Sequence, residues 1–390
     1  MIIKNGNIIT PDGILHNTDL RIEDGRITEI GNNLEGDAEI YYADNMYVGP
    51  GYVDIHTHGG HGSDFMDDNP DAIDKILDFH TKNGTTSLLA STVTAPVEQI
   101  VGMIGRVRDY MKTQSGKTRI MGVHIEGPYI SYKNKGAQKE EFLRVPAKDD
   151  YSFILENNDV IKNVTIATEL DGAEKMTQDM RNAGIVVSCG HDDGKSETAY
   201  PVIDAGATNL THWYCAMSTA RVEDGKRSAG LMEIGLTDDR LTLELLADNH
   251  HLPPELVKMA YKAKGAAKLC LVSDCLRAGG MPRDGRVYTL GTEGDEEATK
   301  FIVSNGVARL TDGTRFAGSI QPVSQMVRNI VNECQIPVVD AVRMASLTPA
   351  EIIGESDRIG SISVGKVADI NILNEELYPV KTIIDGKFIN

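Results

Sequence analysis

Short apolar runs alternate with helix-like segments along the middle of the chain, from about residue 49 onward. Runs of this kind, bounded by turn signals, are typical of buried strands. Eight of them predict strands, at Tyr52–Ile55, Ser87–Thr92, Arg119–Ile125, Val164–Thr168, Ile185–Cys189, Thr208–Leu210, Leu241–Leu246 and Leu269–Val272. Because strands joined through helices form parallel sheets, the pattern predicts an α/β protein built on a (β/α)8 TIM barrel.

The segment between the first two runs predicts a helix. Asn69-Pro70 precedes apolar residues at helical spacing, among them Ile73, Ile76 and Leu77. Asn at the N-cap and Pro at the first helical position are typical start signals. We therefore expect this helix to begin at Pro70.

The two ends of the chain have a different pattern. Residues 1–48 consist of short alternating runs broken by turns such as Asn5-Gly6 and Asp24-Gly25, which is typical of β-hairpins. Residues 351–390 are similar, so we expect a small β-sandwich domain formed from both ends, flanking a barrel at 49–350. Two connections, 127–163 and 279–316, are long enough to predict lids or binding loops.

Composition narrows the class of protein. A formal net charge of −18 argues against nucleic acid, which demands a basic surface, and it means that an anionic substrate needs a local cationic pocket. Five cysteines without a CxxC pair predict a reducing cytoplasm rather than a disulfide framework. No apolar stretch reaches membrane-spanning length, and no secretory signal is visible, so we expect no membrane partner.

The histidines give the first indication of chemistry, because five of the ten lie at predicted strand ends. His56 and His58 end the first strand, and residues two apart on a strand project to the same face. Further candidate ligands lie at the ends of four other strands: Glu126, His191, His212 and Asp274. Barrel active sites form at this end of the strands. Imidazole nitrogens and carboxylate oxygens suit zinc or iron, so the pattern predicts a catalytic metal site.

Each of these residues has a structural alternative when taken alone. A His-x-His pair arises by chance, His191 or His212 fits a hydrogen-bonded structural histidine, Asp274 fits a helix N-cap, and Glu126 fits a salt bridge at the rim. Six candidate ligands on five strands, all at the same end, favour the metal site.

The chain resembles the amidohydrolase superfamily in its His-x-His, its two later histidines and its strand-eight aspartate. More narrowly, four motifs are similar to those of N-acetylglucosamine-6-phosphate deacetylases: His124-Ile-Glu-Gly-Pro-Tyr-Ile130, Gly190-His191, Thr211-His212-x-Tyr-x-Ala-Met217 and Leu271-Val-Ser-Asp274. The resemblance covers almost the whole chain. It implies a metal-dependent barrel enzyme, usually a homodimer, that removes acetyl from an amino-sugar phosphate.

The resemblance also implies roles for single residues. Glu126, His191 and His212 correspond to ligands of the principal metal, and His56 and His58 to ligands of a second. Zinc is the first expectation for one or two divalent ions, with iron, manganese or cobalt as alternatives. Asp274 corresponds to the catalytic carboxylate, and His251 to a histidine that contacts substrate.

Three substrate-pocket positions depart from the family pattern. Gln138 stands where the family usually has a histidine, and Cys215-Ala216 where it has Asn-Ala. The family's Arg-Glu-Pro-Gly segment is absent, so Arg227 is the phosphate-binding candidate, with a solvated loop arginine as its structural alternative. We expect Gln138, Cys215, Ala216, Arg227 and His251 to bind substrate. The departures leave open another N-acetylhexosamine phosphate, such as the galacto epimer, or another acylated amine.

Two other functions compete with this one. A dihydroorotase-like or dipeptidase-like enzyme would usually carry a carboxylated lysine at the end of strand four, but Ala167-Thr-Glu-Leu170 has none. A barrel protein that has lost its activity would lack a ligand or the aspartate, and none is missing. The sequence therefore favours the deacetylase.

Overall fold

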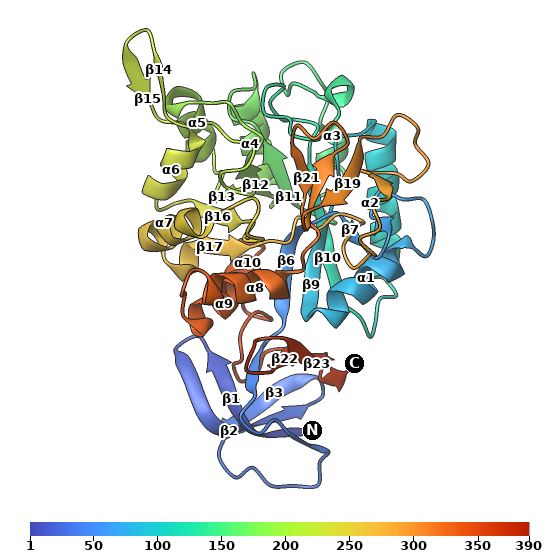
Figure 1. Ribbon diagram of the computed structural model, residues 1–390, viewed down its shortest axis with the longest axis vertical. Helices are drawn as coiled ribbons and strands as arrows, with labels where there is room; N and C mark the ends of the chain where they lie inside the picture. Colours follow the sequence, from blue (N-terminus) through green and yellow to red (C-terminus); the bar gives the residue numbers. More distant parts are fainter. Residues whose placement is uncertain (390) are drawn as a thin grey trace.

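The computed structural model describes residues 1–389, and a parallel eight-stranded barrel forms its body (Figure 1). The strands follow one another around the sheet in chain order. They are β6 (Tyr52–Thr57), β9 (Thr85–Ser91), β10 (Arg119–Glu126), β11 (Ile161–Ile166), β12 (Val186–Cys189), β13 (Asn209–Leu210), β16 (Thr242–Leu245) and β17 (Leu269–Leu271). All eight predicted strands are confirmed, with ends shifted by up to three residues. Apart from the half-buried Arg119 and Lys162, their residues are buried, as in parallel strands covered on both faces.

The two edges of this sheet meet where β17 returns to β6. The backbone N–H of Asp274 donates to the carbonyl of His56 at 2.9 Å, and the N–H of His58 donates to the carbonyl of Cys275 at 3.0 Å. These bonds bring the end of the eighth strand beside the end of the first. The predicted (β/α)8 barrel is confirmed.

Helices cover the outside of the barrel (Figure 1). They are α1 (Ala72–Lys82), α2 (Val97–Met111), α3 (Ser152–Leu155), α4 (Ala173–Asn182), α5 (Ser196–Asp204), α6 (Leu231–Thr237), α7 (Pro254–Lys264), α8 (Val323–Asn332), α9 (Val338–Ala345) and α10 (Leu347–Ile352). Short 3-10 turns lie at Glu140–Phe142 and Ala266–Lys268. No helix among residues 1–389 is long and apolar enough to cross a bilayer.

Helix α1 buries the predicted apolar face but begins two residues later than expected. The side chain of Asn69 accepts a hydrogen bond from the backbone N–H of Asp71 at 2.9 Å, and the carbonyl of Asn69 accepts one from Ala72. Asn69-Pro70 therefore forms the turn that precedes the helix, because an Asn side chain bonded two residues ahead mimics a backbone turn.

Both ends of the chain pair in one sheet at the end of the barrel where the strands begin (Figure 1). Its strands are β1 (Ile2–Thr10), β2 (Gly13–Glu23), β3 (Arg26–Gly31), β4 (Ile40–Tyr42), β5 (Tyr47–Pro50), β22 (Ile370–Leu373), β23 (Pro379–Ile384) and β24 (Lys387–Phe388). The N-terminal β5 pairs antiparallel with the C-terminal β22, for example Val48 with Ile372. The division at 48/49 and 350/351 stays a prediction.

Both long connections fold over the opposite end of the barrel. Residues 127–163 carry α3, and residues 279–316 form most of an antiparallel sheet of four strands. These are β18 (Val287–Thr289), β19 (Lys300–Ser304), β20 (Val307–Leu310) and β21 (Phe316–Gly318). Two smaller hairpins join β7 (Gly59–Gly60) to β8 (Ser63–Asp64) and β14 (Arg221–Glu223) to β15 (Lys226–Ser228), and the second protrudes from the body (Figure 1).

Candidate metal centre and active site

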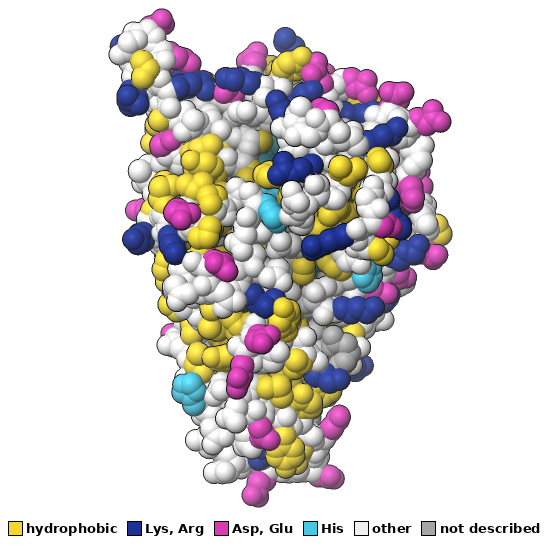
Figure 2. All heavy atoms as spheres, in the orientation of Figure 1, with side chains coloured by type: hydrophobic (Ala, Val, Ile, Leu, Met, Phe, Trp, Pro, Cys, Tyr) yellow, Lys and Arg dark blue, Asp and Glu magenta, His cyan; other side chains and the backbone are white. Residues whose placement is uncertain are grey.

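The C-terminal ends of the barrel strands surround a cavity of about 420 Å³. Most of the predicted site residues line it: His58, Glu126, Gln138, His191, His212, Cys215, Ala216, His251 and Asp274. The two long connections supply further parts of the wall, including Asn134, Gly136 and Phe316. The space-filling view shows a histidine near the middle of one face with lysine and arginine side chains around it (Figure 2).

Glu126, at the end of β10, is the centre of the cluster. Its Oε1 lies 3.2 Å from Nε2 of His191 and 3.1 Å from Nε2 of His212, and those two ring nitrogens are 3.1 Å apart. All three side chains are buried. One carboxylate oxygen and two imidazole nitrogens therefore converge on a single point from β10, β12 and β13.

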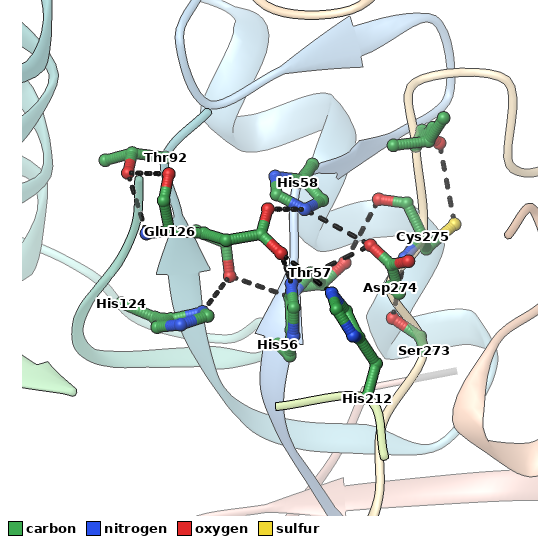
Figure 3. Close-up of polar contacts among 12 residues, drawn as sticks. His56, Thr57, His58, Thr92, His124, Glu126, His212, Ser273, Asp274 and Cys275 are labelled. Atoms are coloured by element: carbon green, nitrogen blue, oxygen red, sulfur yellow. Dashed lines mark hydrogen bonds and ion pairs between the residues drawn. The ribbon is translucent and has the colours of Figure 1, made fainter. Parts of the chain in front are cut away.

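The first strand brings two more imidazoles to the same carboxylate. Nε2 of His56 lies 3.4 Å from Oε1 of Glu126, and Nε2 of His58 lies 3.4 Å from Oε2. Asp274 Oδ1 is 3.2 Å from Nε2 of His58 and 3.7 Å from Nε2 of His56. Figure 3 shows His56, His58 and His212 directed toward Glu126, with Asp274 facing His58.

These donors fit one or two metal ions. His56, His58 and Glu126 form one group, and Glu126, His191 and His212 form another, each with its ligand atoms within 4.8 Å of one another. The buried Nε2 of His56 has no hydrogen-bond partner among residues 1–389. Burial alone would raise the pKa of Glu126, but the charge of His56 and the hydrogen bonds from His191 and His212 hold it well below its usual value. A charged carboxylate beside imidazole nitrogens is a donor set that divalent metals prefer.

Two of the four imidazoles are oriented by hydrogen bonds at the far ring nitrogen. Nδ1 of His191 lies 2.7 Å from the carbonyl oxygen of Asn134, and Nδ1 of His56 lies 3.2 Å from Oε2 of Glu244. A proton held at Nδ1 leaves the Nε2 lone pair for a metal. Glu244, on β16, was not predicted, although a charged residue inside the apolar run Leu241–Leu246 is a signal that could have found it.

His124 lies beside this cluster but does not belong to it. Its Nδ1 is 3.0 Å from Oγ of Ser91, and its Nε2 is 2.8 Å from Oγ1 of Thr165. Burial and the charge of His56 lower the pKa of His124 well below its usual value. His124 is thus a neutral, hydrogen-bonded ring that packs against His56 at a centroid distance of 4.6 Å.

Asp274 is held by the backbone on both sides. Its N–H bonds to His56, and its carbonyl accepts a hydrogen bond from the N–H of Ser319 at 3.0 Å. Burial alone would raise the pKa of Asp274, but the hydrogen bond from His58 and the charge of His56 lower it. The carboxylate therefore faces the cavity in its ionised form, which can accept a proton.

Four of the predicted site residues have left-handed backbone conformations, with φ of 45° at His191, 30° at His212, 47° at Ala216 and 42° at Asp274. Such conformations are uncommon for residues other than glycine and cost on the order of 1–3 kcal/mol each. His191, His212 and Asp274 each lie two or three residues after the end of a barrel strand. The turns direct the side chains over the end of the barrel.

Gln138 contacts Glu126. Its Nε2 donates to Oε2 of Glu126 at 2.7 Å, and its Oε1 accepts a hydrogen bond from the backbone N–H of Thr94 at the same distance. Gln138 also lines the cavity. It therefore orients the central carboxylate in addition to any contact with substrate.

His251 lines the cavity with one ring nitrogen available. Its Nδ1 is 2.9 Å from Oδ2 of Asp248, a residue that was not predicted. The His251 ring packs against Phe316 at a centroid distance of 4.7 Å. Because Asp248 occupies Nδ1, Nε2 is the ring atom left for a ligand in the cavity.

The remaining predicted substrate residues divide into two groups. Cys215 and Ala216 line the cavity, and burial together with the charge of Asp274 raises the pKa of the Cys215 thiol, so that it stays protonated. Arg227 lies on the exposed β14–β15 hairpin and does not line the cavity of its own chain. The exposed Arg315 lines the cavity instead, on a connection whose course the sequence did not predict.

Comparisons with known proteins agree with this geometry. Residues 47–389 match the model of the amidohydrolase family. The chain is 32% identical to N-acetylgalactosamine-6-phosphate deacetylase of Escherichia coli O157:H7, covering 99% of this chain and 98% of that protein. It is also 32% identical to N-acetylglucosamine-6-phosphate deacetylase of Bacillus subtilis, covering 99% of this chain and 96% of the relative.

A solved structure extends the similarity to three dimensions. N-acetyl-D-glucosamine-6-phosphate deacetylase of Mycobacterium smegmatis, an aspartate-to-alanine variant in complex with N-acetyl-D-glucosamine-6-phosphate, is 28% identical. It superposes with a TM-score of 0.89 over 100% of this chain and 99% of that one. A parallel barrel, a buried His/Glu centre at its C-terminal face and a family match over most of the length lead to one conclusion. The chain belongs to the amidohydrolase family of hydrolytic enzymes.

Proposed function

We propose that this enzyme removes the acetyl group from N-acetylglucosamine 6-phosphate. The observation that carries the proposal is the convergence of four imidazoles on Glu126, with Asp274 beside them, in a cavity large enough for a hexose. The relatives named as deacetylases of amino-sugar phosphates, at 32% identity over nearly full length, support it.

In this proposal Glu126, His191 and His212 hold the principal divalent ion, and His56 and His58 hold a second. Zinc is the proposed ion, and the same nitrogen and oxygen donors suit iron, manganese or cobalt. A bound divalent ion supplies Lewis-acid polarisation of the acetyl carbonyl and acidifies a water molecule. Elemental analysis of the purified protein measures the identity and number of the ions.

Asp274 is the proposed proton carrier. Its ionised carboxylate accepts a proton as water attacks the acetyl carbon, and it returns that proton to the amine nitrogen when the C–N bond breaks. Nε2 of His251, held in place by Asp248 and Phe316, forms a hydrogen bond with the substrate. Gln138, Cys215 and Ala216 complete the substrate contacts.

A second candidate substrate is the galacto epimer, N-acetylgalactosamine 6-phosphate. The identity of 32% to the Escherichia coli enzyme named for that substrate equals the identity to the gluco enzyme, which is the specific reason to test it. The decisive experiment compares deacetylation of gluco and galacto N-acetylhexosamines, each with and without the 6-phosphate. If the enzyme deacetylates none of the four compounds, the proposed function is contradicted.

We also propose a cytoplasmic homodimer that binds neither nucleic acid nor membranes. Five free cysteines and a net charge of −18 support the location and the lack of nucleic-acid binding. A phosphate contact from Arg227 requires a second copy of the chain, because the β14–β15 hairpin lies outside the cavity of its own chain. Light scattering after size-exclusion chromatography measures the oligomeric state.

A further inference from the structure

Two residues with permanently cationic side chains line the cavity, Lys133 and Arg315, and they differ in their partners. Lys133 Nζ lies 3.0 and 2.9 Å from the two carboxylate oxygens of Asp193, so its charge is already paired. The guanidinium of Arg315 makes no hydrogen bond or ion pair with any residue from 1 to 389. Asp312, in the same turn, interacts with it only through longer-range charge. Arg315 is therefore the cavity cation that has no fixed anionic partner.

The strand that follows Arg315 is fixed to the catalytic end of the barrel. β21 begins at the next residue and leads to Ser319, whose N–H donates to the carbonyl of Asp274 at 3.0 Å and whose carbonyl accepts from Leu276 at 2.9 Å. Four extended residues rise about 13 Å, so the backbone of Arg315 lies within that distance of Ser319. A hexose ring together with an arginine side chain bridges such a distance.

Aromatic packing gives Arg315 a rigid neighbour. The ring of Phe316 contacts His251 on one side, at a centroid distance of 4.7 Å, and the guanidinium of Arg309 lies 4.5 Å from its centroid. Arg309 does not line the cavity, whereas Phe316 and His251 do. An unpaired guanidinium and an imidazole whose Nδ1 is already bonded to Asp248 thus line the same cavity.

We propose that Arg315 is a specificity-determining residue that binds the 6-phosphate of the substrate from within the same chain. The inference rests on the proposed function. In a protein of net charge −18, a phosphorylated sugar needs a local cation, and an unpaired guanidinium offers paired N–H donors that match phosphate oxygens. The phosphate then lies at the Arg315 side of the cavity and the acetyl group at Glu126.

The test compares wild type, Arg315→Gln and the matched control Arg286→Gln on N-acetylglucosamine with and without the 6-phosphate. Arg286 lies on the same connection but is exposed and paired with Asp284. For Arg315→Gln we expect KM for the phosphorylated sugar to rise about 10- to 100-fold, the size of lost charge-assisted hydrogen bonds. The KM for the sugar without phosphate should not change. Arg315→Lys should restore part of the affinity for the phosphorylated sugar, because lysine keeps the positive charge but lacks the paired N–H donors of a guanidinium.

Titration calorimetry with inorganic phosphate gives a second measurement that does not depend on turnover. We expect weaker phosphate binding by Arg315→Gln and unchanged binding by Arg286→Gln. If Arg315→Gln keeps the wild-type preference for the phosphorylated sugar, the inference is wrong while the deacetylase proposal stands. If wild type deacetylates the plain sugar equally well, phosphate recognition itself is refuted. If wild type deacetylates neither sugar, the proposed function fails.

Discussion

The side chain of Glu244 lies directly behind that of His56, with Oε2 of Glu244 3.2 Å from Nδ1 of His56 and both side chains fully buried. The same oxygen accepts the backbone N–H of His212 at 3.1 Å, and Oε1 accepts a hydrogen bond from Asn209 at 2.7 Å. One carboxylate on β16 therefore supports candidate ligands on β6 and β13.

Replacing Glu244 by Gln should weaken metal binding at His56. The glutamine side chain carries no charge, and its NH2 group must face one of the hydrogen-bond donors that the two oxygens of Glu244 now accept from. We expect metal affinity to fall about 10- to 100-fold, the usual effect of removing a partner of a ligating histidine. Metal content measured against free metal concentration tests this, with the exposed Glu255→Gln as control. Equal affinity in wild type and Glu244→Gln would contradict a supporting role.

Asp274→Asn should remove turnover and retain the metal. Asn has nearly the same shape and tolerates the left-handed backbone at this position, but it cannot accept the proton. We expect kcat to fall about 10²- to 10⁴-fold, the range for loss of a general acid–base group. Turnover near the wild-type rate would exclude Asp274 as the proton carrier, and the exposed Asp239→Asn should behave as wild type.

Gln138→Leu should disturb the central carboxylate. The change leaves the N–H of Thr94 and Oε2 of Glu126 without their 2.7 Å partner, which costs about 1–3 kcal/mol for a buried polar group. Thermal unfolding should occur at a lower temperature, and metal affinity should fall about 10-fold. Gln138→His keeps a donor and should lose less. Unchanged unfolding temperature and metal binding in Gln138→Leu would show that the contact to Glu126 is unimportant.

Removal of the metal by a chelator should abolish turnover and lower the unfolding temperature. A ligand that binds only the folded protein stabilises it by mass action, so removing the ion destabilises the cluster around Glu126. Addition of a divalent ion should restore both properties. Full activity in protein that contains no metal detectable by elemental analysis would contradict the proposed centre.

Asp19→Asn should destabilise the terminal sheet in a pH-dependent way. Burial alone would raise the pKa of Asp19, but hydrogen bonds from the backbone of Asn5, from Lys4 and from the backbone of Leu34 lower it. Because the folded-state pKa lies below the unfolded-state value, this stabilisation is complete above about pH 4 and disappears as the pH falls through the folded-state pKa. We expect a loss of about 1–3 kcal/mol at pH 7. Denaturant unfolding at several pH values measures the difference in unfolding free energy between wild type and Asp19→Asn. If that difference does not shrink in acid, the stabilisation does not come from the ionised Asp19 carboxylate.

The barrel and most of the cluster could be predicted because they depend on local patterns. Buried parallel strands are continuous apolar runs, and polar residues directly after them share one end of the sheet, which located His191, His212 and Asp274. The position of Arg315 could not be predicted in this way. It depends on how the 279–316 connection folds back and pairs Ser319 beside Cys275, a long-range contact with no periodic signal. Arg227 illustrates the reverse: it was the phosphate candidate from a segment that departs from the family pattern, and the β14–β15 hairpin places it outside the cavity of its own chain.

The pairing of β5 with β22 brings both chain ends to the side of the molecule opposite the cavity (Figure 1). The protein can therefore be tethered through either terminus, by an affinity tag or a short linker to a solid support, with the cavity still open to solution. An immobilised form attached at Met1 should keep the KM of the free enzyme, provided that the linker leaves the N-terminal strand in its sheet.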